Sequence, residues 1–136
     1  MQLISEQKEV CLFLSQLKTI LQSPKFNLDT DLDILMKKKN EDPCDPFTTA
    51  NTLAELAFDS RDVVCELLKI EICNYVATVT DNKNPSFPPF FVFRREINKK
   101  EVYIKVKIRD KLNNKVFCVS FHFARHPFQR PLPYEF

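Results

Sequence analysis

The chain has 136 residues and a formal net charge of +2, enough for one domain with a hydrophobic core but too little charge for a histone-like polycation. It contains no glycine, which excludes glycine-rich phosphate loops, dinucleotide-binding turns and nucleophile elbows. The five cysteines include no C-x-x-C pair, and no signal-peptide pattern or apolar run of about 18 residues occurs. We therefore expect a cytoplasmic protein with no membrane partner, no metal and no cofactor.

Charge is unevenly distributed along the chain. From Arg94 to Arg130 there are eleven lysines and arginines against three acidic residues, whereas the preceding half is acidic. Such a bipolar molecule can present its basic side to an anion. The alternative is that these cations are only the solvated side chains of a sheet.

Helical spacing of apolar residues predicts four helices in the first half, over residues 6–22, 30–39, 49–57 and 60–69. Ser5 is the expected N-cap of the first helix, and Asp59 that of the last. Lys37 to Lys39 would lie at the C-terminal end of the second helix, exposed to solvent, where positive charges interact favourably with the helix dipole.

The second half predicts strands. A turn followed by a strand is expected within residues 70–80, and a proline-rich loop over 81–89. Three longer strands should follow, over residues 90–97, 101–109 and 116–123. The prediction is an α+β fold in a single domain, with residues 1–75 mainly helical and 76–130 mainly sheet. The N-terminal helices would pack on one face of a C-terminal antiparallel β-sheet.

Period-two alternation in the two longest strands fixes their register, because a one-residue slip would mix apolar and polar faces. With residues 110–115 as the loop, the predicted pairs are Ile104 with Phe121, Val106 with Val119, Tyr103 with His122 and Lys105 with Ser120. A two-residue turn at Asn98 and Lys99 would pair Arg94 with Tyr103. The polar face would then carry Arg94, Tyr103 and His122 in a row. It would also carry Cys118. A catalytic role for the thiol of Cys118 is a weaker alternative to a site built on His122.

Two segments of this sheet resemble a known family. Residues 91–108, with the run Val102-Tyr-Ile-Lys105, and residues 116–127, with Ser120-Phe-His-Phe-Ala124, are similar to the MqsR toxins of type II toxin–antitoxin systems. These toxins are related in fold to the RelE-like messenger-RNA interferases. Residues 43–53 and the pair Asn74-Tyr75 also look like a variant of this family, and the resemblance covers roughly residues 43–130.

The resemblance implies a RelE/MqsR-like fold and a metal-independent messenger-RNA endoribonuclease. Such enzymes activate the ribose 2′-hydroxyl to attack the adjacent phosphate, leaving a 2′,3′-cyclic phosphate. The implied partners are a cognate antitoxin protein and messenger RNA, either free or on the ribosome. We predict Tyr103, His122 and Lys105 as catalytic residues. Predicted RNA-binding residues are Arg94, Lys107, Arg125 and Tyr75.

A second function remains open from the sequence. Val76, Phe91 and Lys99 stand where family members commonly have lysine, tryptophan and glycine. These departures favour a catalytically inactive module that binds RNA, the ribosome or a protein through the same face. The presence of Tyr103, Lys105 and His122 together favours the enzyme.

Overall fold

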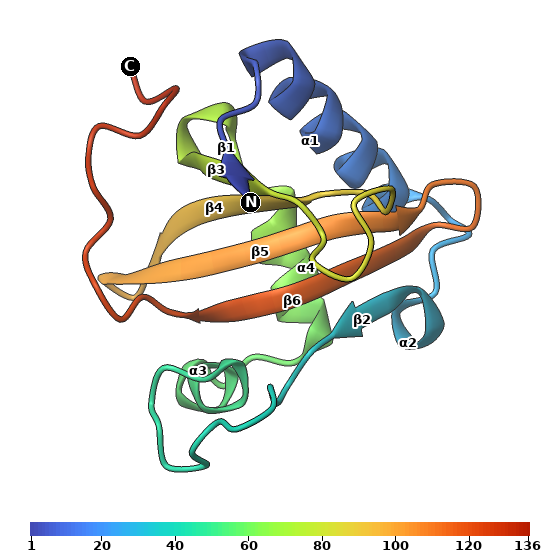
Figure 1. Ribbon diagram of the computed structural model, residues 1–136. Coiled ribbons are helices and arrows are strands. Elements are labelled where there is room, and N and C mark those ends of the chain that lie inside the picture. Colours follow the sequence, from blue (N-terminus) through green and yellow to red (C-terminus); the bar gives the residue numbers. More distant parts are fainter.

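A computed structural model describes residues 1–136. The chain forms a mixed α+β structure with four helices and a six-stranded, mostly antiparallel open sheet in the order β1-β3-β4-β5-β6-β2 (Figure 1). The elements are β1 (Gln2–Leu3), α1 (Gln7–Gln22), α2 (Leu28–Asp31), β2 (Leu32–Ile34), α3 (Thr49–Leu56), α4 (Ser60–Leu68), a 3₁₀ turn (Ile72–Asn74), β3 (Tyr75–Val79), β4 (Phe90–Ile97), β5 (Lys100–Asp110) and β6 (Lys115–Phe123).

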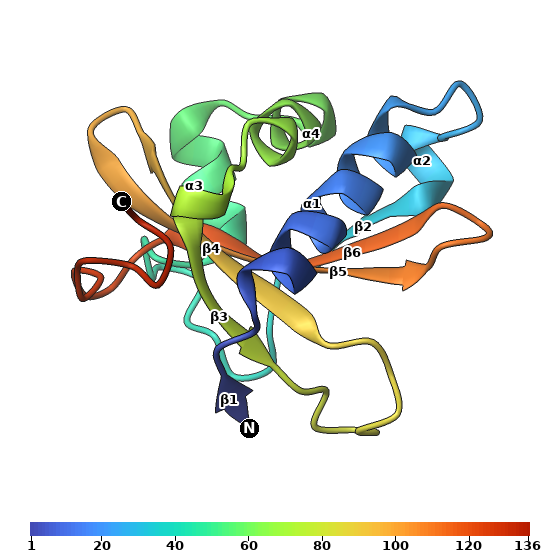
Figure 2. The same cartoon turned by 90° about the horizontal axis from the view of Figure 1, so that it is seen from above.

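Helices α1 and α4 lie on the same side of the sheet (Figure 2). Their apolar stripes, including Leu17 and Leu67, are fully buried against strand residues such as Phe93 and Phe121. Phe13 of α1 stacks on Phe91 of β4, with ring centroids 4.1 Å apart. Since burying one such side chain stabilises a fold by about 1.5–3 kcal/mol, this layer holds the sheet in place and leaves its other face free of helices.

The predicted ends of the helices are partly confirmed. Asp59 and Asp62 form the expected capping box at the start of α4. Ser5 was expected to cap α1, and that prediction is wrong. The N-cap is Glu6, because the Ser5 side chain is used elsewhere: its Oγ lies 2.7 Å from Oγ1 of Thr78 in β3.

The helix predicted over residues 30–39 is also wrong. Only one turn forms, α2, whose N-cap side chain Asn27 accepts a hydrogen bond from the Asp29 N–H. Leu32 to Ile34 then extend and pair in parallel with residues 116–118 of β6. Pairing with a strand edge overrides the local helical preference, as tertiary context often does.

The predicted strand register is confirmed for the pairs Arg94–Tyr103, Tyr103–His122, Ile104–Phe121 and Lys105–Ser120. Asn98 and Lys99 form the two-residue turn between β4 and β5, both with positive φ. The predicted pair Val106–Val119 is wrong. Val106 pairs with Cys118, because a β-bulge adds one residue to β6 at this point.

Because of the bulge, the side chains in the first half of β6 point to the opposite face of the sheet from the one predicted. Cys118 turns into the core and is fully buried, and burial raises the pKa of its thiol to about 12. The prediction that Cys118 lies on the polar face is therefore wrong, and a catalytic thiol is excluded because the thiolate is the nucleophilic form. Phe117 correspondingly leaves the core face and contacts Arg109 and Phe90.

Helix α3 does not pack on the helical face with α1 and α4 but lies beside the edge of β6, where Figure 1 shows it nearly end-on. The N–H groups of Phe121 and Phe123 donate to the hydroxyls of Thr49 (3.2 Å) and Thr52 (3.0 Å). Both threonines are buried. Their hydroxyls thus satisfy backbone groups that β2 is too short to reach.

We expect Thr49→Val and Thr52→Val each to lower the free energy of unfolding by about 1–3 kcal/mol, because each leaves a buried N–H without an acceptor. Urea-induced unfolding checks this. Thr19→Val, at an exposed position of α1, is the control and should change stability by less than about 0.5 kcal/mol. Equal stability of all three variants would contradict the assignment of α3 as the cover of the β6 edge.

Candidate active site on the outer face of the sheet

The candidate site lies on the face of the sheet that α1 and α4 do not cover, called the outer face below. Cross-strand pairing and ring contacts place these side chains on the outer face: Phe90, Val92 and Arg94 from β4, Tyr103, Lys105, Lys107 and Arg109 from β5, and Phe117, Ser120 and His122 from β6. Three predicted residues, Tyr103, Lys105 and His122, lie close together here.

Tyr103 is held by aromatic stacking. Its ring is nearly parallel to those of His122 (centroids 5.2 Å apart, 13°) and Phe128 (6.2 Å, 8°). Its hydroxyl has no hydrogen-bond partner in the protein. Every buried side-chain polar atom in the chain except Nε of Arg95 has such a partner. The unpaired hydroxyl of Tyr103 is therefore not buried and reaches solvent. Burial raises the pKa of Tyr103, which keeps the phenol protonated at neutral pH and makes it a hydrogen-bond donor.

His122 has one ring nitrogen engaged and one free. Nδ1 lies 2.9 Å from the carbonyl oxygen of Phe123. Since a carbonyl only accepts, Nδ1 carries the proton, and Nε2 is left with its lone pair. Nε2 has no partner and is not buried. Burial lowers the pKa of His122, so at neutral pH the imidazole is uncharged and its exposed nitrogen can accept a proton.

Two lysines flank Ser120 without forming an ion pair. Lys38, in the segment after β2, donates from Nζ to Oγ of Ser120 at 2.6 Å. Lys105 lies opposite Ser120 on β5, with its Nζ 5.0 Å from the centroid of the Phe90 ring. Burial lowers the pKa of both ammonium groups, and the charge of Lys38 lowers the pKa of Lys105 further. Two half-buried cations that repel each other form a site suited to an anion.

Arg94 and Arg125, two of the predicted RNA-binding residues, are already paired with carboxylates. Arg94 donates to Glu101 at 2.9 Å, and Glu101 also accepts from the Phe128 N–H. This arrangement holds the C-terminal segment beside Tyr103. Arg125 is bound to Asp45 and is half exposed, so it borders the site but does not bring an uncompensated charge.

Lys107 and Tyr75, the other two predicted RNA-binding residues, are not accessible. Lys107 is buried on the outer face beneath the loop 81–89 and binds Asp81 at 2.8 Å. Tyr75 lies on the opposite, helix-covered face, fully buried, with its hydroxyl 2.6 Å from Oγ1 of Thr78. Their burial places both side chains outside the candidate site.

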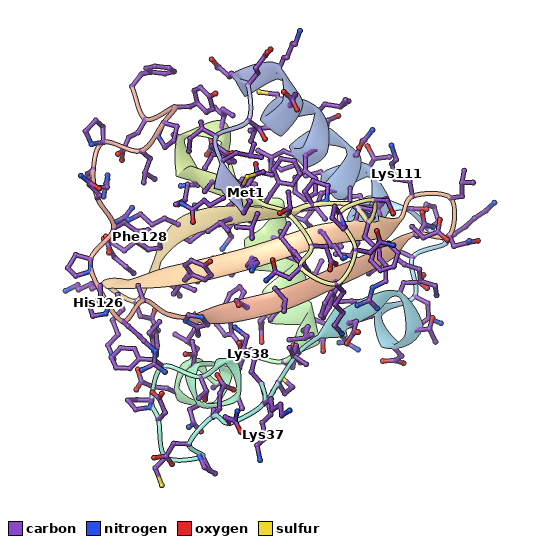
Figure 3. The ribbon with its side chains drawn as sticks, in the orientation of Figure 1. Met1, Lys37, Lys38, Lys111, His126 and Phe128 are labelled. Carbon is purple, nitrogen blue, oxygen red and sulfur yellow. The ribbon has the colours of Figure 1, made fainter.

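Sequence reasoning missed Lys38, which it assigned to a solvated helix end. Lys38 lies beside β6, whereas Lys37 extends away from the strands and is exposed (Figure 3). Its placement follows from the pairing of β2 with β6. The sequence signal was only a run of three lysines after an apolar stretch, which carries no information about the partner strand. Ser120 and Phe128 were likewise not singled out as site residues.

No protein-family model matches the chain, and no curated protein matches it either. No group of three or more His, Cys, Asp or Glu side chains is arranged to hold a metal ion. None of the helices has the length and apolar character needed to cross a bilayer.

We expect Lys38→Met to raise the pKa of His122 and that of Lys105, because the positive charge of Lys38 disfavours a second cation at each group. Titration of the imidazole resonances by NMR checks the first shift, and it should also report the Nδ1-protonated tautomer. Lys37→Met, which removes an exposed charge next in sequence, is the control and should leave His122 unchanged. An unchanged or lowered His122 pKa in the Lys38 variant would contradict this geometry.

Proposed function

We propose that the protein is a metal-independent endoribonuclease that cleaves messenger RNA by attack of a ribose 2′-hydroxyl on the adjacent phosphate. One observation carries the proposal: the free Nε2 of a neutral His122 lies in the same site as the free hydroxyl of Tyr103 and the unpaired ammonium of Lys105. This reaction requires a proton acceptor, a proton donor and cations at the phosphate.

His122 is the general base in this mechanism. Its Nε2 takes the proton of the 2′-hydroxyl, and the hydrogen bond from Nδ1 to the Phe123 carbonyl (2.9 Å) holds the ring and stabilises the positive charge that develops. The lowered pKa keeps the base unprotonated at neutral pH. The 2′-oxygen then forms its bond to phosphorus as the bond to the 5′-oxygen breaks.

Lys105 and Lys38 bind the phosphate and stabilise the charge of its transition state. The leaving 5′-oxygen needs a proton, and Lys105 suits this role because burial and the charge of Lys38 lower its pKa, so that it gives up its proton more readily than an ordinary lysine. Tyr103 suits it less, since burial moves the pKa of the phenol the other way. We therefore assign Tyr103 to a hydrogen bond to a phosphate oxygen.

We propose further that the protein acts as the toxin of a type II toxin–antitoxin module with a RelE/MqsR-like fold. Support comes from the resemblance of residues 91–108 and 116–127 to MqsR toxins, and from a mixed α+β fold whose sheet leaves one face open. A cognate antitoxin would then have to block the outer face or distort it.

The test is incubation of the purified protein with a defined messenger RNA in EDTA, with and without ribosomes, followed by identification of the fragment ends. We expect 2′,3′-cyclic phosphate ends, and a rate reduced by about 10²–10⁴ in His122→Gln because general-base catalysis is lost. His126→Gln is the matched control, since His126 is exposed in the segment after β6, and it should cleave normally.

RNA that stays intact under both conditions would contradict the proposal. If that intact RNA were still bound, the outer face would be an inactive binding module. Equal losses in the two histidine variants would contradict the assignment of His122 as the base.

A further inference from the structure

The outer face carries a hollow, about 590 Å³ in volume, on the side of Phe90 away from His122. We call it the distal groove and define it by Lys83, Phe87, Phe90, Arg109, Phe117 and Val119. The loop 81–89 forms one wall and strands β5 and β6 form its floor. The mechanism above does not use any of these residues.

Aromatic rings and a guanidinium group line the distal groove. Phe117 meets the edge of Phe90, with centroids 6.0 Å apart, and Cζ of Arg109 lies 4.1 Å from the centroid of Phe117. Phe87, in the loop, is 48% exposed. Rings and arginine planes of this kind are what unpaired nucleobases stack on.

The groove also has an excess of positive charge. Its lining includes Lys83, Lys107 and Arg109 but only one acidic residue, Asp81. Asp81 is already bound to Lys107, which leaves the charges of Lys83 and Arg109. Arg109 contacts Asp33 at 3.3 Å, but both side chains are about half exposed, so water and salt weaken this pair. The groove is therefore suited to an anionic ligand with flat apolar parts.

The distal groove adjoins the candidate active site at Phe90. The ring of Phe90 lies under both Lys105 (5.0 Å) and Lys107 (4.5 Å). Lys105 and Arg109 are four residues apart on β5, which corresponds to about 13 Å along a strand. A polymer whose phosphate is bound at Lys105 therefore needs to span only about this distance to reach the groove.

We propose that the distal groove binds a nucleotide of single-stranded RNA that flanks the cleaved bond. The base stacks on Phe87 and Phe117, and the phosphate contacts Arg109 and Lys83. This inference rests on the proposed ribonuclease function and specifies its substrate as single-stranded RNA longer than a dinucleotide. Paired bases cannot enter the groove, because their faces are already stacked within the duplex.

The test compares Phe87→Ala/Arg109→Gln with the wild type in binding a twelve-nucleotide 2′-O-methyl RNA, which lacks the 2′-hydroxyl and cannot be cleaved. We expect the Kd for this RNA to rise about tenfold, as loss of one stacked base typically produces. The slope of log K against log salt should become shallower by about 0.7 through the lost arginine contact. The Kd for a 2′-O-methyl dinucleotide should stay unchanged.

Leu112→Ala/Lys111→Gln is the matched control, because it removes one exposed apolar side chain and one charge at the same end of the sheet (Figure 3). Lys111 borders a different groove, next to α1. This control should bind both RNAs as the wild type does.

Three results would overturn the inference: equal Kd of the groove variant and the wild type for the longer RNA, equal weakening for the dinucleotide, or no binding of the longer RNA by either protein. Binding does not depend on cleavage here. A tenfold effect with an inactive enzyme would therefore support the groove while refuting the ribonuclease. Cleavage of RNA by the wild type, together with an unchanged Kd in the groove variant, would support the ribonuclease and refute the groove.

Discussion

The pairing of β5 with β6, and the one-residue bulge within it, determines what the outer face can do. On one side of the bulge the pair Tyr103–His122 places the phenol and the imidazole in a stack. On the other side the extra residue turns Cys118 inward and Phe117 outward. A regular ladder would bury Phe117 and expose a thiol, and the distal groove would lose part of its aromatic floor.

Partial burial gives the site its chemistry. The same loss of water that lowers the pKa of His122 lowers the pKa of Lys105 and raises that of Tyr103. The three groups thereby separate into a neutral acceptor, a cation that gives up its proton more readily, and a phenol that keeps its own. The one buried lysine, Lys107, has a carboxylate partner in Asp81. The half-buried Lys38 and Lys105 form no ion pair, and this is the feature that points to an external anion.

The sequence was informative where side-chain alternation alone determines the structure. It predicted the strands and the rows that join Arg94, Tyr103 and His122, because one slip would have exposed the apolar face. It was not informative about the bulge, which needs the three-dimensional match of β6 to both β5 and β2. The same limit explains Lys38: a lysine run is polar in any environment, and only the pairing of β2 with β6 places one of its members over Ser120. Tyr75 shows the converse, since a residue matched to a family motif lies in the core.

The pH dependence of cleavage tests the central claim most directly, that a neutral, partly buried His122 is the base. The single-turnover rate of RNA cleavage should rise with pH through a midpoint that lies below the ordinary histidine value of about 6.5 and equals the pKa of His122 measured by NMR. At higher pH the rate should fall again as Lys105 loses the proton that it donates to the leaving oxygen. A rate that does not change between about pH 5 and 8, or a midpoint that differs from the His122 pKa, would contradict the account.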